Sequence, residues 1–303
     1  MSDIDLHRLS QCYGRAFAGC ELVVPGVNRT YRTAAGDDVY YLRLYRPIGR
    51  SPVEIAFEMR LLREVRPIPG IAVARPIRTV DGEDCAHVQL NGVGRIAGLF
   101  QALDGRPLID DTEDVALFGS ALAKLHSALA GIDGGGVRPL DPAALCARAA
   151  ASLMSIPGSE AAQCAVDRCR VEILGDPAAQ DLPSGNCHGD ARLANAVVKD
   201  GSVGFFDFDD CGCGAYVLDL GTAAWHFLRG DPAKMAVLVA ALLAGYGRVR
   251  PLSRAELQVL PYYVKLAEVR ALLFLAEFCT LADGLWPLVL DRATDLLERE
   301  LTI

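Results

Sequence analysis

The segments HGDARLAN, residues 188–195, and FFDFDD, residues 205–210, decide the fold of this 303-residue chain. The first contains an acid, Asp190, and a carboxamide, Asn195, and the second contains Asp207. Two short β-prone runs join them through a Lys-Asp-Gly sequence, in which Asp-Gly is a hairpin turn signal. We therefore predict a β-hairpin that brings Asn195 and Asp207 together at its two ends, without help from distant parts of the chain.

These residue types, in this order, match what phosphoryl transfer from a nucleotide needs. A carboxylate must orient the acceptor hydroxyl and take up its proton, while an Asn and a second carboxylate hold magnesium ions. Asp190 and Asn195 have the D-x-x-x-x-N spacing of a kinase catalytic loop, and Asp207 follows where the metal-binding Asp is expected. The alternative is a chance set of acids in an ordinary α/β domain, with Asp-Gly and Asp-Asp forming turns.

The motif H-G-D-x-x-x-x-N, then F-D-F-D-D, then Leu-Asp-Leu at 218–220, resembles the aminoglycoside phosphotransferase and choline/homoserine-kinase-like family. These proteins are small-molecule relatives of the protein kinases. The resemblance covers nearly the whole chain, and its specific part is residues 187–221. Within that part we interpret His188 as a structural histidine that braces the loop, and Asp219 as a loop-stabilising carboxylate.

The resemblance implies an α+β, protein-kinase-like bilobal fold. Residues 1–102 would form a β-rich N-lobe, a five-stranded sheet plus a helix that covers the nucleotide. Residues 103–303 would form a mostly helical C-lobe with the catalytic loop, the metal site and the acceptor-binding helices. A short helix within residues 2–20 would precede the nucleotide lobe.

Residues 21–33 have the pattern of strand, turn and strand, and the turn would cover the phosphates. Its residues Asn28, Arg29 and Thr30 resemble the N-R-T-Y form of the small-molecule kinases, which implies that they bind the nucleotide. A plain hairpin turn is the alternative interpretation of the same residues.

Arg43 lies on a third predicted strand, residues 38–47, where the resemblance places the phosphate-binding lysine. Arginine is always charged and can hold phosphate with two nitrogens, so an analogous role is predicted. The following helix begins with the capping box Ser51-Pro-Val-Glu54, and its apolar stripe includes Glu58. A carboxylate on a buried face needs a partner, and Arg43 is the natural one. A surface position for either residue is the alternative.

Two further predicted strands, residues 71–77 and 86–90, would close the five-stranded sheet. Residues 98–108 resemble the hinge between the lobes, where the backbone from Phe100 to Ala102 would bind the adenine edge. Backbone donors leave no side-chain signature, so this placement rests on the resemblance alone. Five residues of the helical region either line an acceptor pocket or pack in the core: Trp225, His226, Tyr262, Tyr263 and Glu268.

Composition excludes several classes of protein. The chain is 51% hydrophobic and 22% charged, which is typical of a folded protein. Its net charge of −8 argues against a nucleic-acid partner, and no run reaches the roughly 18–20 apolar residues that span a membrane. Acids near the start stand where a secretory signal has bases, so we expect a cytoplasmic protein whose ten cysteines are reduced.

The resulting prediction is a phosphotransferase that moves the γ-phosphate of ATP, or alternatively of GTP, to a hydroxyl group with the help of Mg²⁺. Asp190 would be the base, and Arg192 would stabilise transferred charge or pair with a surface acid. The acceptor would be an aminoglycoside, homoserine or a choline-like molecule. A peptide Ser/Thr hydroxyl and a pseudokinase or scaffold without turnover remain alternatives, and the oligomeric state is not specified by the sequence.

Overall fold

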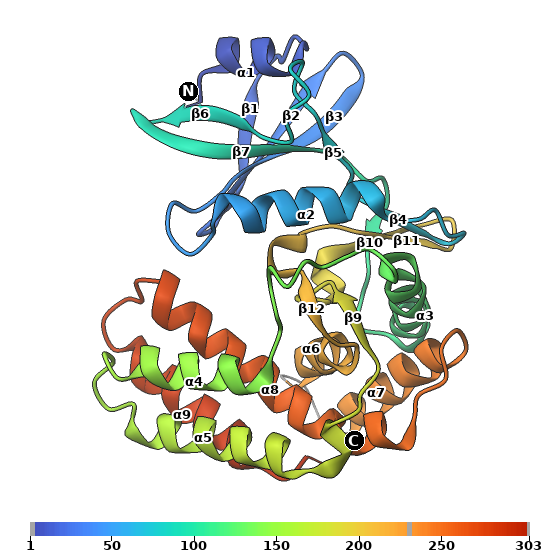
Figure 1. Ribbon diagram of the computed structural model, residues 1–303, viewed down its shortest axis with the longest axis vertical. Coiled ribbons are helices and arrows are strands. Elements are labelled where there is room, and N and C mark those ends of the chain that lie inside the picture. The colour runs from blue at the N-terminus through green and yellow to red at the C-terminus, as the bar shows by residue number, and fades with distance from the viewer. Residues whose placement is uncertain (1–3, 229–231, 302–303) are drawn as a thin grey trace.

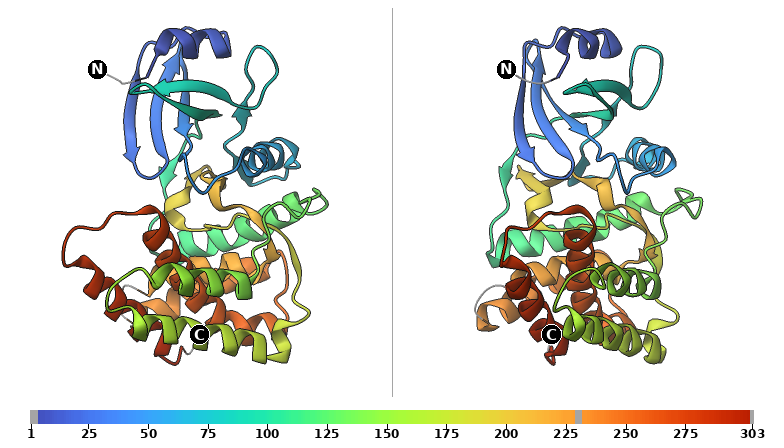
Figure 2. Two further views of the ribbon diagram at one scale, coloured as in Figure 1. Left: turned by 60° about the vertical axis from the view of Figure 1, so that its left-hand side comes forward. Right: turned by 90° about the vertical axis from the view of Figure 1, so that its left-hand side faces the viewer.

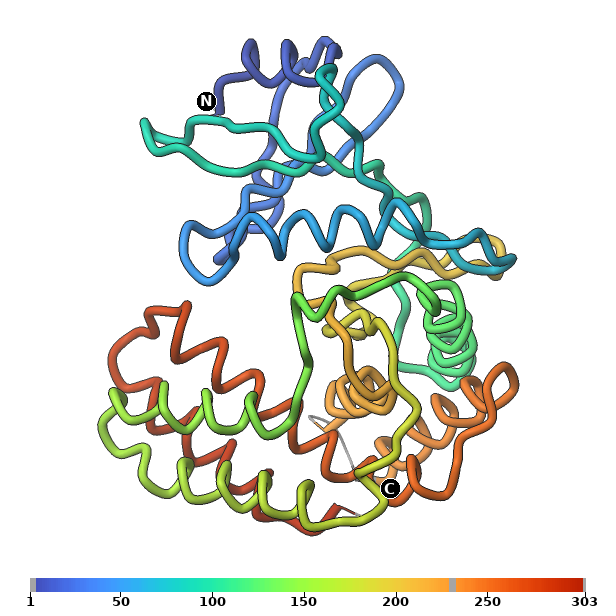
Figure 3. The backbone as a smooth tube through the Cα atoms, in the orientation of Figure 1, coloured from blue at the N-terminus to red at the C-terminus, as the bar shows by residue number. Residues whose placement is uncertain are grey.

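The computed structural model describes residues 4–228 and 232–301. They form a β-rich part, drawn from blue to cyan at the top of Figure 1, and a larger helical part below it. This is the two-part α+β architecture predicted from the sequence. The path from the sheet down into the first long helix of the lower part can be followed in Figure 3.

The described residues of the upper part contain a six-stranded antiparallel sheet rather than the predicted five-stranded one. The strands pair in the order β1-β2-β3-β7-β5, and β6 also pairs with β7. Their bounds are β1 (Cys20–Pro25), β2 (Arg29–Ala35), β3 (Asp38–Leu44), β5 (Pro76–Ile77), β6 (Ala86–Leu90) and β7 (Val93–Gln101).

The additional strand is β7, which includes residues 98–101 of the stretch predicted as the hinge, 98–108. β6 and β7 form a hairpin whose turn residues Asn91 and Gly92 have φ values of 50° and 77°. Positive φ at both residues is the pattern of a type I′ hairpin, for which Asn-Gly is a strong sequence signal. This signal was present in the sequence, and it would have extended the sheet to residue 101.

Two helices cover opposite faces of this sheet (Figure 2). On one face α1 (Leu6–Tyr13) buries Leu9 and Tyr13 in a core with Tyr40 and Leu42 of β3. On the other lies α2 (Pro52–Glu64), which begins with the predicted capping box. Because side chains alternate along a strand, the odd residues of β3 point toward α2 and the lower part of the molecule. This alternation places Arg43 on the side of the cleft between the two parts.

A second sheet lies below α2 and carries the motif segments. Its order is β4-β11-β10-β8, and β4 runs parallel to β11. The predicted hairpin is confirmed: β10 and β11 pair with Ala196 opposite Phe205. The bounds are β4 (Ile71–Val73), β8 (Arg106–Pro107), β10 (Ala196–Lys199) and β11 (Ser202–Phe205), and a separate pair is β9 (Ser184–Cys187) with β12 (Gly212–Ala215).

The predicted strand at 71–77 is therefore wrong as a single strand of the first sheet. Only β5 joins that sheet, while β4 joins the sheet that carries the motifs. Proline at position 76 lacks the N–H that would continue a strand, and the chain changes sheets just before it. Strand β4, which precedes the last strands of the upper part in the chain, thus belongs to the sheet that carries the two motif segments.

The lower part is a helical bundle. Its helices are α3 (Thr112–Leu129), α4 (Pro142–Leu153), α5 (Glu160–Gly175), α6 (Val217–Phe227), α7 (Pro232–Gly247), α8 (Arg254–Phe278) and α9 (Leu285–Glu298), with short 3₁₀ turns η1 (Pro177–Ala179), η2 (Leu193–Asn195) and η3 (Phe208–Asp210). Helices α3 and α7 cross closely, since an added Cβ at Gly245 would lie 2.0 Å from the Ala116 carbonyl oxygen. Among the residues described, no helix has the length and apolar character to cross a membrane.

Candidate active site

Gly189 explains how the two motif segments pack. Its φ of +82° lies in the left-handed region, and an added Cβ would lie 1.7 Å from the carbonyl oxygen of Asp210. Only glycine permits both the backbone conformation and this approach. The loop that carries Asp190 is therefore packed directly against the backbone of the second segment.

Asp219, on α6, holds the same loop through its backbone. The two carboxylate oxygens accept the N–H of His188 at 2.7 Å and the N–H of Gly189 at 2.8 Å. Burial alone raises the pKa of this carboxyl, but the hydrogen bond and charge of His126, with help from His188, hold the pKa of Asp219 below its ordinary value. Asp219 is thus the loop-stabilising carboxylate that the sequence predicts.

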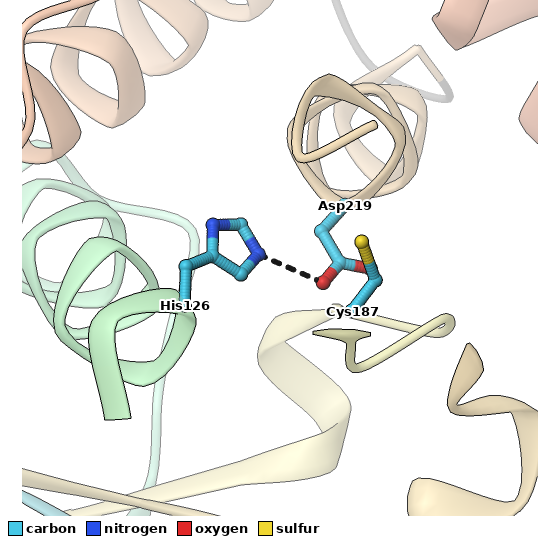
Figure 4. A group of neighbouring side chains, drawn as sticks. All are labelled: His126, Cys187 and Asp219. Carbon is cyan, nitrogen blue, oxygen red and sulfur yellow. Dashed lines mark hydrogen bonds and ion pairs between the residues drawn. The ribbon is translucent and has the colours of Figure 1, made fainter. Parts of the chain in front are cut away.

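His126 of α3 braces Asp219 from the other side. Its Nε2 lies 3.0 Å from Asp219 Oδ2, and its Nδ1 lies 2.7 Å from the hydroxyl of Tyr246 on α7. The thiol of Cys187 completes a fully buried group with His126 and Asp219 (Figure 4). Both oxygens of Asp219 already accept hydrogen bonds from the protein, so we interpret this group as structural support and not as a metal site.

His188 connects the two motif segments, as expected for a structural histidine. Its Nε2 lies 3.0 Å from the carbonyl oxygen of Phe206, and its Nδ1 accepts the N–H of Asp190 at 3.2 Å. One imidazole thereby fixes the position of the loop that carries Asp190 relative to the segment that follows β11.

We expect Asp219→Asn to lower the free energy of unfolding by about 1–3 kcal/mol, the cost of leaving a buried donor without an acceptor. The amide group would place an N–H donor against a backbone N–H donor in a fully buried site. Urea denaturation measures the change, with Asp295→Asn on the exposed face of α9 as the matched control. Equal stability of Asp219→Asn and the control would contradict the bracing role.

The side chains of Asp190 and Asn195 are in contact, as their spacing predicts. Asn195 Nδ2 donates to Asp190 Oδ2 at 2.8 Å and to the Asp190 carbonyl at 2.9 Å. Arg192 Nη2 donates to the same Oδ2 at 2.5 Å. Within the described residues Asp190 Oδ1 and Asn195 Oδ1 have no hydrogen-bond partner. One oxygen of the acid and one of the carboxamide are thus available to ligands.

Asp207 lies at the end of β11, at the start of the turn η3. Its φ of 64° is unusual for a residue other than glycine and is typical of functional sites that hold local strain. The side chain is 45% exposed, and its Oδ1 accepts from Arg43 Nη2 at 2.8 Å. The hairpin brings this acid to the same end as Asn195, as predicted.

Arg43 links Asp207 to Glu58 of α2. Its Nη1 donates to Glu58 Oε1 at 2.8 Å, while Nη2 holds Asp207. The ring of Phe100 packs 5.3 Å from the guanidinium carbon. Burial lowers the pKa of Arg43, but the carboxylates of Asp207 and Glu58 raise it well above its ordinary value. The predicted Arg43–Glu58 pair is confirmed, and the contact with phosphate remains a prediction.

Glu58 also accepts a hydrogen bond from Tyr45, which the sequence did not indicate. The Tyr45 hydroxyl donates to Glu58 Oε2 at 2.9 Å, so both carboxylate oxygens have partners. Burial raises the pKa of Glu58 to about 7, and the charge of Arg43 opposes that shift. The predicted alternative of a surface Glu58 is wrong, since the residue is 1% exposed.

The loop between β1 and β2 lies over the cleft, and the three residues predicted to bind the nucleotide differ in their placement. Asn28 Oδ1 accepts the backbone N–H of Arg46 at 2.9 Å, which ties the loop to the end of β3. Thr30 pairs with Arg43 in the β2–β3 register and shares its face. Arg29 pairs with a leucine that belongs to the core beneath α1, so this register gives no support to its nucleotide role.

The backbone from Phe100 to Ala102, predicted to bind adenine, already makes contacts within the sheet. The N–H of Ala102 donates to the carbonyl oxygen of Val39 at 3.1 Å, and Phe100 lies inside β7 opposite Tyr41. Among the described residues, the next backbone N–H, that of Leu103, has no partner. Residues 102–105 follow β7 and lie outside the sheet, within the stretch 98–108 predicted as the hinge, and the role of this stretch stays a prediction.

A cluster of arginines surrounds the second motif segment, residues 205–210. No pattern in the sequence predicted this cluster. Asp209 Oδ2 accepts from Arg46 at 2.7 Å, and its Oδ1 accepts from Arg50 at 3.0 Å. Arg50 also donates to Asp210 Oδ1 at 2.6 Å, and Arg138 donates to the Asp209 carbonyl oxygen. Burial raises the pKa of Asp209, but Arg50 and the neighbouring arginines hold it far below its ordinary value. These contacts join the β3–α2 connection to the helical part.

A cleft of about 660 Å³ opens in front of these residues. Its lining includes acids of the two motif segments and residues of the β1–β2 loop, namely Asp190, Asp207, Asp209 and Asp210 with Gly26, Val27 and Asn28. Of the five residues considered as pocket lining, Trp225 does line the cleft, and its Nε1 donates to Glu268 at 2.5 Å. The site thus combines the free oxygen of Asp190 with one oxygen each of Asn195 and Asp207 that could bind a metal ion. A cavity lies next to these residues.

Comparison with known proteins agrees with this geometry. The family described as "Phosphotransferase enzyme family" matches residues 26–252. A homoserine kinase of Gluconacetobacter diazotrophicus is 32% identical over 266 residues, which cover 85% of this chain and 79% of that protein. An uncharacterized protein of Deinococcus radiodurans is 31% identical over 275 residues, which cover 88% of this chain and 79% of that protein.

Solved structures share the fold. An amicoumacin kinase in complex with AMP-PNP, Ca²⁺ and Ami has a TM-score of 0.77 at 18% identity, covering 97% of this chain and 92% of that one. A microcompartment-associated aminopropanol kinase has a TM-score of 0.65 at 24% identity, covering 92% and 90%. At these identities the likeness concerns the fold, while the family match concerns the sequence. The chain therefore belongs to the phosphotransferase enzyme family and is a phosphotransferase of protein-kinase-like fold.

Proposed function

We propose that this protein transfers the γ-phosphate of ATP to a hydroxyl group of a small molecule. The observation that carries the proposal is the convergence of Asp190, Asn195 and Asp207, on a loop held by Asp219 and at the adjoining end of the β10–β11 hairpin, where both acids line one cleft. The nucleotide would bind between residues 1–102 and residues 103–303.

Asp190 would orient the acceptor hydroxyl through its free Oδ1 and take up the proton of that hydroxyl. The acceptor oxygen forms a bond to the γ-phosphorus while the bond between this phosphorus and the β–γ bridging oxygen breaks, so ADP leaves. The other oxygen of Asp190 is held by Asn195 and Arg192, which prevents the carboxylate from rotating away. Arg192 would also lie near the transferred charge, where a cation is useful.

The donor set suits a hard divalent cation such as Mg²⁺. Asn195 Oδ1 and the second oxygen of Asp207 are oxygen donors without a partner among the described residues, and Mg²⁺ prefers such ligands. When bound, the ion would neutralise charge on the phosphates. Arg43 would hold Asp207 in position and, through Glu58, tie it to α2.

The nucleotide phosphates would lie beneath the β1–β2 loop, near Asn28 and Thr30. The adenine edge would face the backbone that follows β7, where Leu103 offers a free N–H and the N–H of Ala102 is already engaged. Because the recognition of adenine would use backbone groups, exchanging these side chains would not remove it.

The test of the proposed function is an acceptor screen with purified protein, ATP and Mg²⁺. The panel contains aminoglycosides, homoserine, choline, amino alcohols and Ser/Thr peptides, and ADP release and product mass are followed together. Acceptor-dependent ADP release with a phosphorylated small molecule supports the proposal. Phosphorylated peptides alone would favour the peptide-kinase alternative. No turnover with any acceptor, despite nucleotide binding, would favour a pseudokinase.

We expect Asp207→Ala and Asn195→Ala each to weaken the Mg²⁺-dependent binding of AMP-PNP, and Asp207→Ala to weaken it more. The Asp207 carboxylate contributes a full negative charge to the cation, whereas the Asn195 carboxamide contributes a dipole. Calorimetry with and without Mg²⁺ measures the effect, and the titration without Mg²⁺ serves as the internal control. An Asp207 variant that keeps the wild-type magnesium dependence would remove this residue from the metal site.

A further inference from the structure

Arg270, on α8, is a nearly buried cation in the cleft wall that lacks a close acid. Its side chain is 13% exposed, and Nη1 donates to Thr222 Oγ1 at 3.3 Å. The nearest carboxylate oxygen, Oδ2 of Asp210, lies 3.9 Å from Nη2, beyond hydrogen-bond distance. A guanidinium has five N–H donors, and within the described residues Arg270 uses one of them. A buried charge in this state is expected to have a further partner.

The acid nearest to Arg270 already serves other arginines. Asp210 Oδ1 accepts from Arg50 Nη2 at 2.6 Å, and Arg138 Nη2 lies 3.6 Å from the same oxygen. Asp209, the neighbouring acid, is held by Arg46 and Arg50. Within the described residues, Arg270 is therefore the arginine of this cluster with the longest distance to its nearest carboxylate oxygen, 3.9 Å to Asp210.

The charge of the cleft wall points in the same direction. The described lining contains six arginines and five acids: Arg46, Arg50, Arg138, Arg148, Arg192 and Arg270 against Glu54, Asp190, Asp207, Asp209 and Asp210. The whole chain carries a net charge of −8, so the cleft differs in sign from the protein around it. Of the acids in this lining, Asp209 and Asp210 already pair with Arg46 and Arg50.

Apolar side chains lie beside Arg270 in the cleft wall. Phe274 follows it by one helical turn on α8, and Ala271, Leu140 and Phe278 line the same cleft. The arrangement offers a cationic group, an apolar wall and, at the reaction centre, the free oxygen of Asp190.

We propose that the acceptor is a hydroxyl compound that carries a carboxylate, and that Arg270 binds this carboxylate while the hydroxyl faces Asp190. The planar guanidinium can bind both oxygens of a carboxylate with two parallel hydrogen bonds. The proposal rests on the proposed function of the same site and specifies its substrate class. The transferred group and the path of the proton remain those described for Asp190.

Binding in the presence of AMP-PNP and Mg²⁺ tests the proposal without requiring turnover. The probes are homoserine and 4-hydroxybutyrate, which carry the carboxylate, 3-aminopropan-1-ol, which is homoserine without it, and kanamycin as a polycation. We expect calorimetry to give at least about 10-fold tighter binding of the better hydroxy acid than of the amino alcohol, from hydrogen bonds to a charged group. Equal or tighter binding of 3-aminopropan-1-ol or kanamycin would overturn the proposal.

The variant Arg270→Gln tests the residue itself. It should weaken binding of the hydroxy acid by about 10- to 100-fold and leave the amino alcohol and AMP-PNP unchanged, because only the carboxylate loses a charged partner. Arg270→Lys should recover part of the affinity, and it replaces the Gln variant if that variant fails to fold. Arg168→Gln, on an exposed pair with Glu298, is the control and should not alter the discrimination.

The possible outcomes separate this proposal from the proposed function. Equal losses for AMP-PNP and for all acceptors would assign Arg270 to the nucleotide and overturn the carboxylate role. Selective binding of hydroxy acids without their phosphorylation would support the carboxylate role and contradict the proposed function. Phosphorylation of amino alcohols with no preference for a carboxylate would support the function and overturn the substrate class.

Discussion

Asp190→Asn is expected to lower kcat by roughly 10²–10⁴-fold, the contribution of a positioned general base, and to leave nucleotide affinity unchanged. The carboxamide keeps the shape of the side chain and can still meet Arg192 with its oxygen, but it cannot accept a proton from the hydroxyl. Turnover is measured with the best acceptor of the screen, and AMP-PNP affinity is measured on the same preparation.

The control for this variant is Asp167→Asn on the exposed face of α5, which should behave as the wild type. Near-normal kcat in an Asp190→Asn preparation free of wild-type protein would remove this residue from the role of base. A loss of nucleotide affinity equal to the loss of kcat would instead assign Asp190 to the binding of the nucleotide–metal complex.

Arg43→Ala is expected to raise the KM for ATP and to lower the free energy of unfolding by about 1–3 kcal/mol, the cost of an unsatisfied buried group. The substitution removes the link between Glu58 and Asp207 and leaves the Glu58 carboxylate with Tyr45 alone. Melting temperature and ATP affinity measured on the same variant test both effects.

The pH dependence of Arg43→Ala supplies a sharper test of its cause. The pKa of Glu58 is already raised to about 7 by burial, and loss of the Arg43 charge removes the effect that opposes this rise. A carboxyl with a raised pKa in the folded state binds a proton more tightly there, so stability falls as pH rises through that pKa. The destabilisation of Arg43→Ala should therefore be larger at pH 8 than at pH 5.

Arg43→Lys should recover part of both properties. An ammonium can hold Glu58 or Asp207 as a point charge, but it cannot hold both acids with a rigid fork. An Arg43→Ala variant with the melting temperature and the ATP affinity of the wild type would contradict the phosphate-binding role.

Local signals were sufficient where the structure is local. The β10–β11 hairpin follows from two β-prone runs around Asp-Gly, and it alone brings Asn195 and Asp207 to one end. The capping box of α2 follows from Ser51 and Glu54. In each case the interacting residues lie a few positions apart, so propensity and turn chemistry decide the outcome.

The incorrect predictions concern strands that pair over long sequence distances. The Asn-Gly turn at residues 91–92 is a local signal for the β6–β7 hairpin, which makes the first sheet six-stranded and not five-stranded. By contrast, no local feature of residues 71–73 indicates that β4 runs parallel to β11, more than 120 residues later. Short apolar strands have few features that select one partner over another, and the remainder of the fold makes the choice.

The sequence by itself determined the family, the candidate base Asp190, the metal-ligand candidates and the two-lobed architecture, because these depend on residue types at short, ordered spacings. Only the tertiary structure decided what surrounds them. The contact of His126 with Asp219, the hydrogen bond from Arg43 to Asp207 and the hydrogen bond from Arg270 to Thr222 join residues from 48 to 164 positions apart. Charges interact through space and not along the chain, so the electrostatic character of the cleft emerges only when distant segments have packed together.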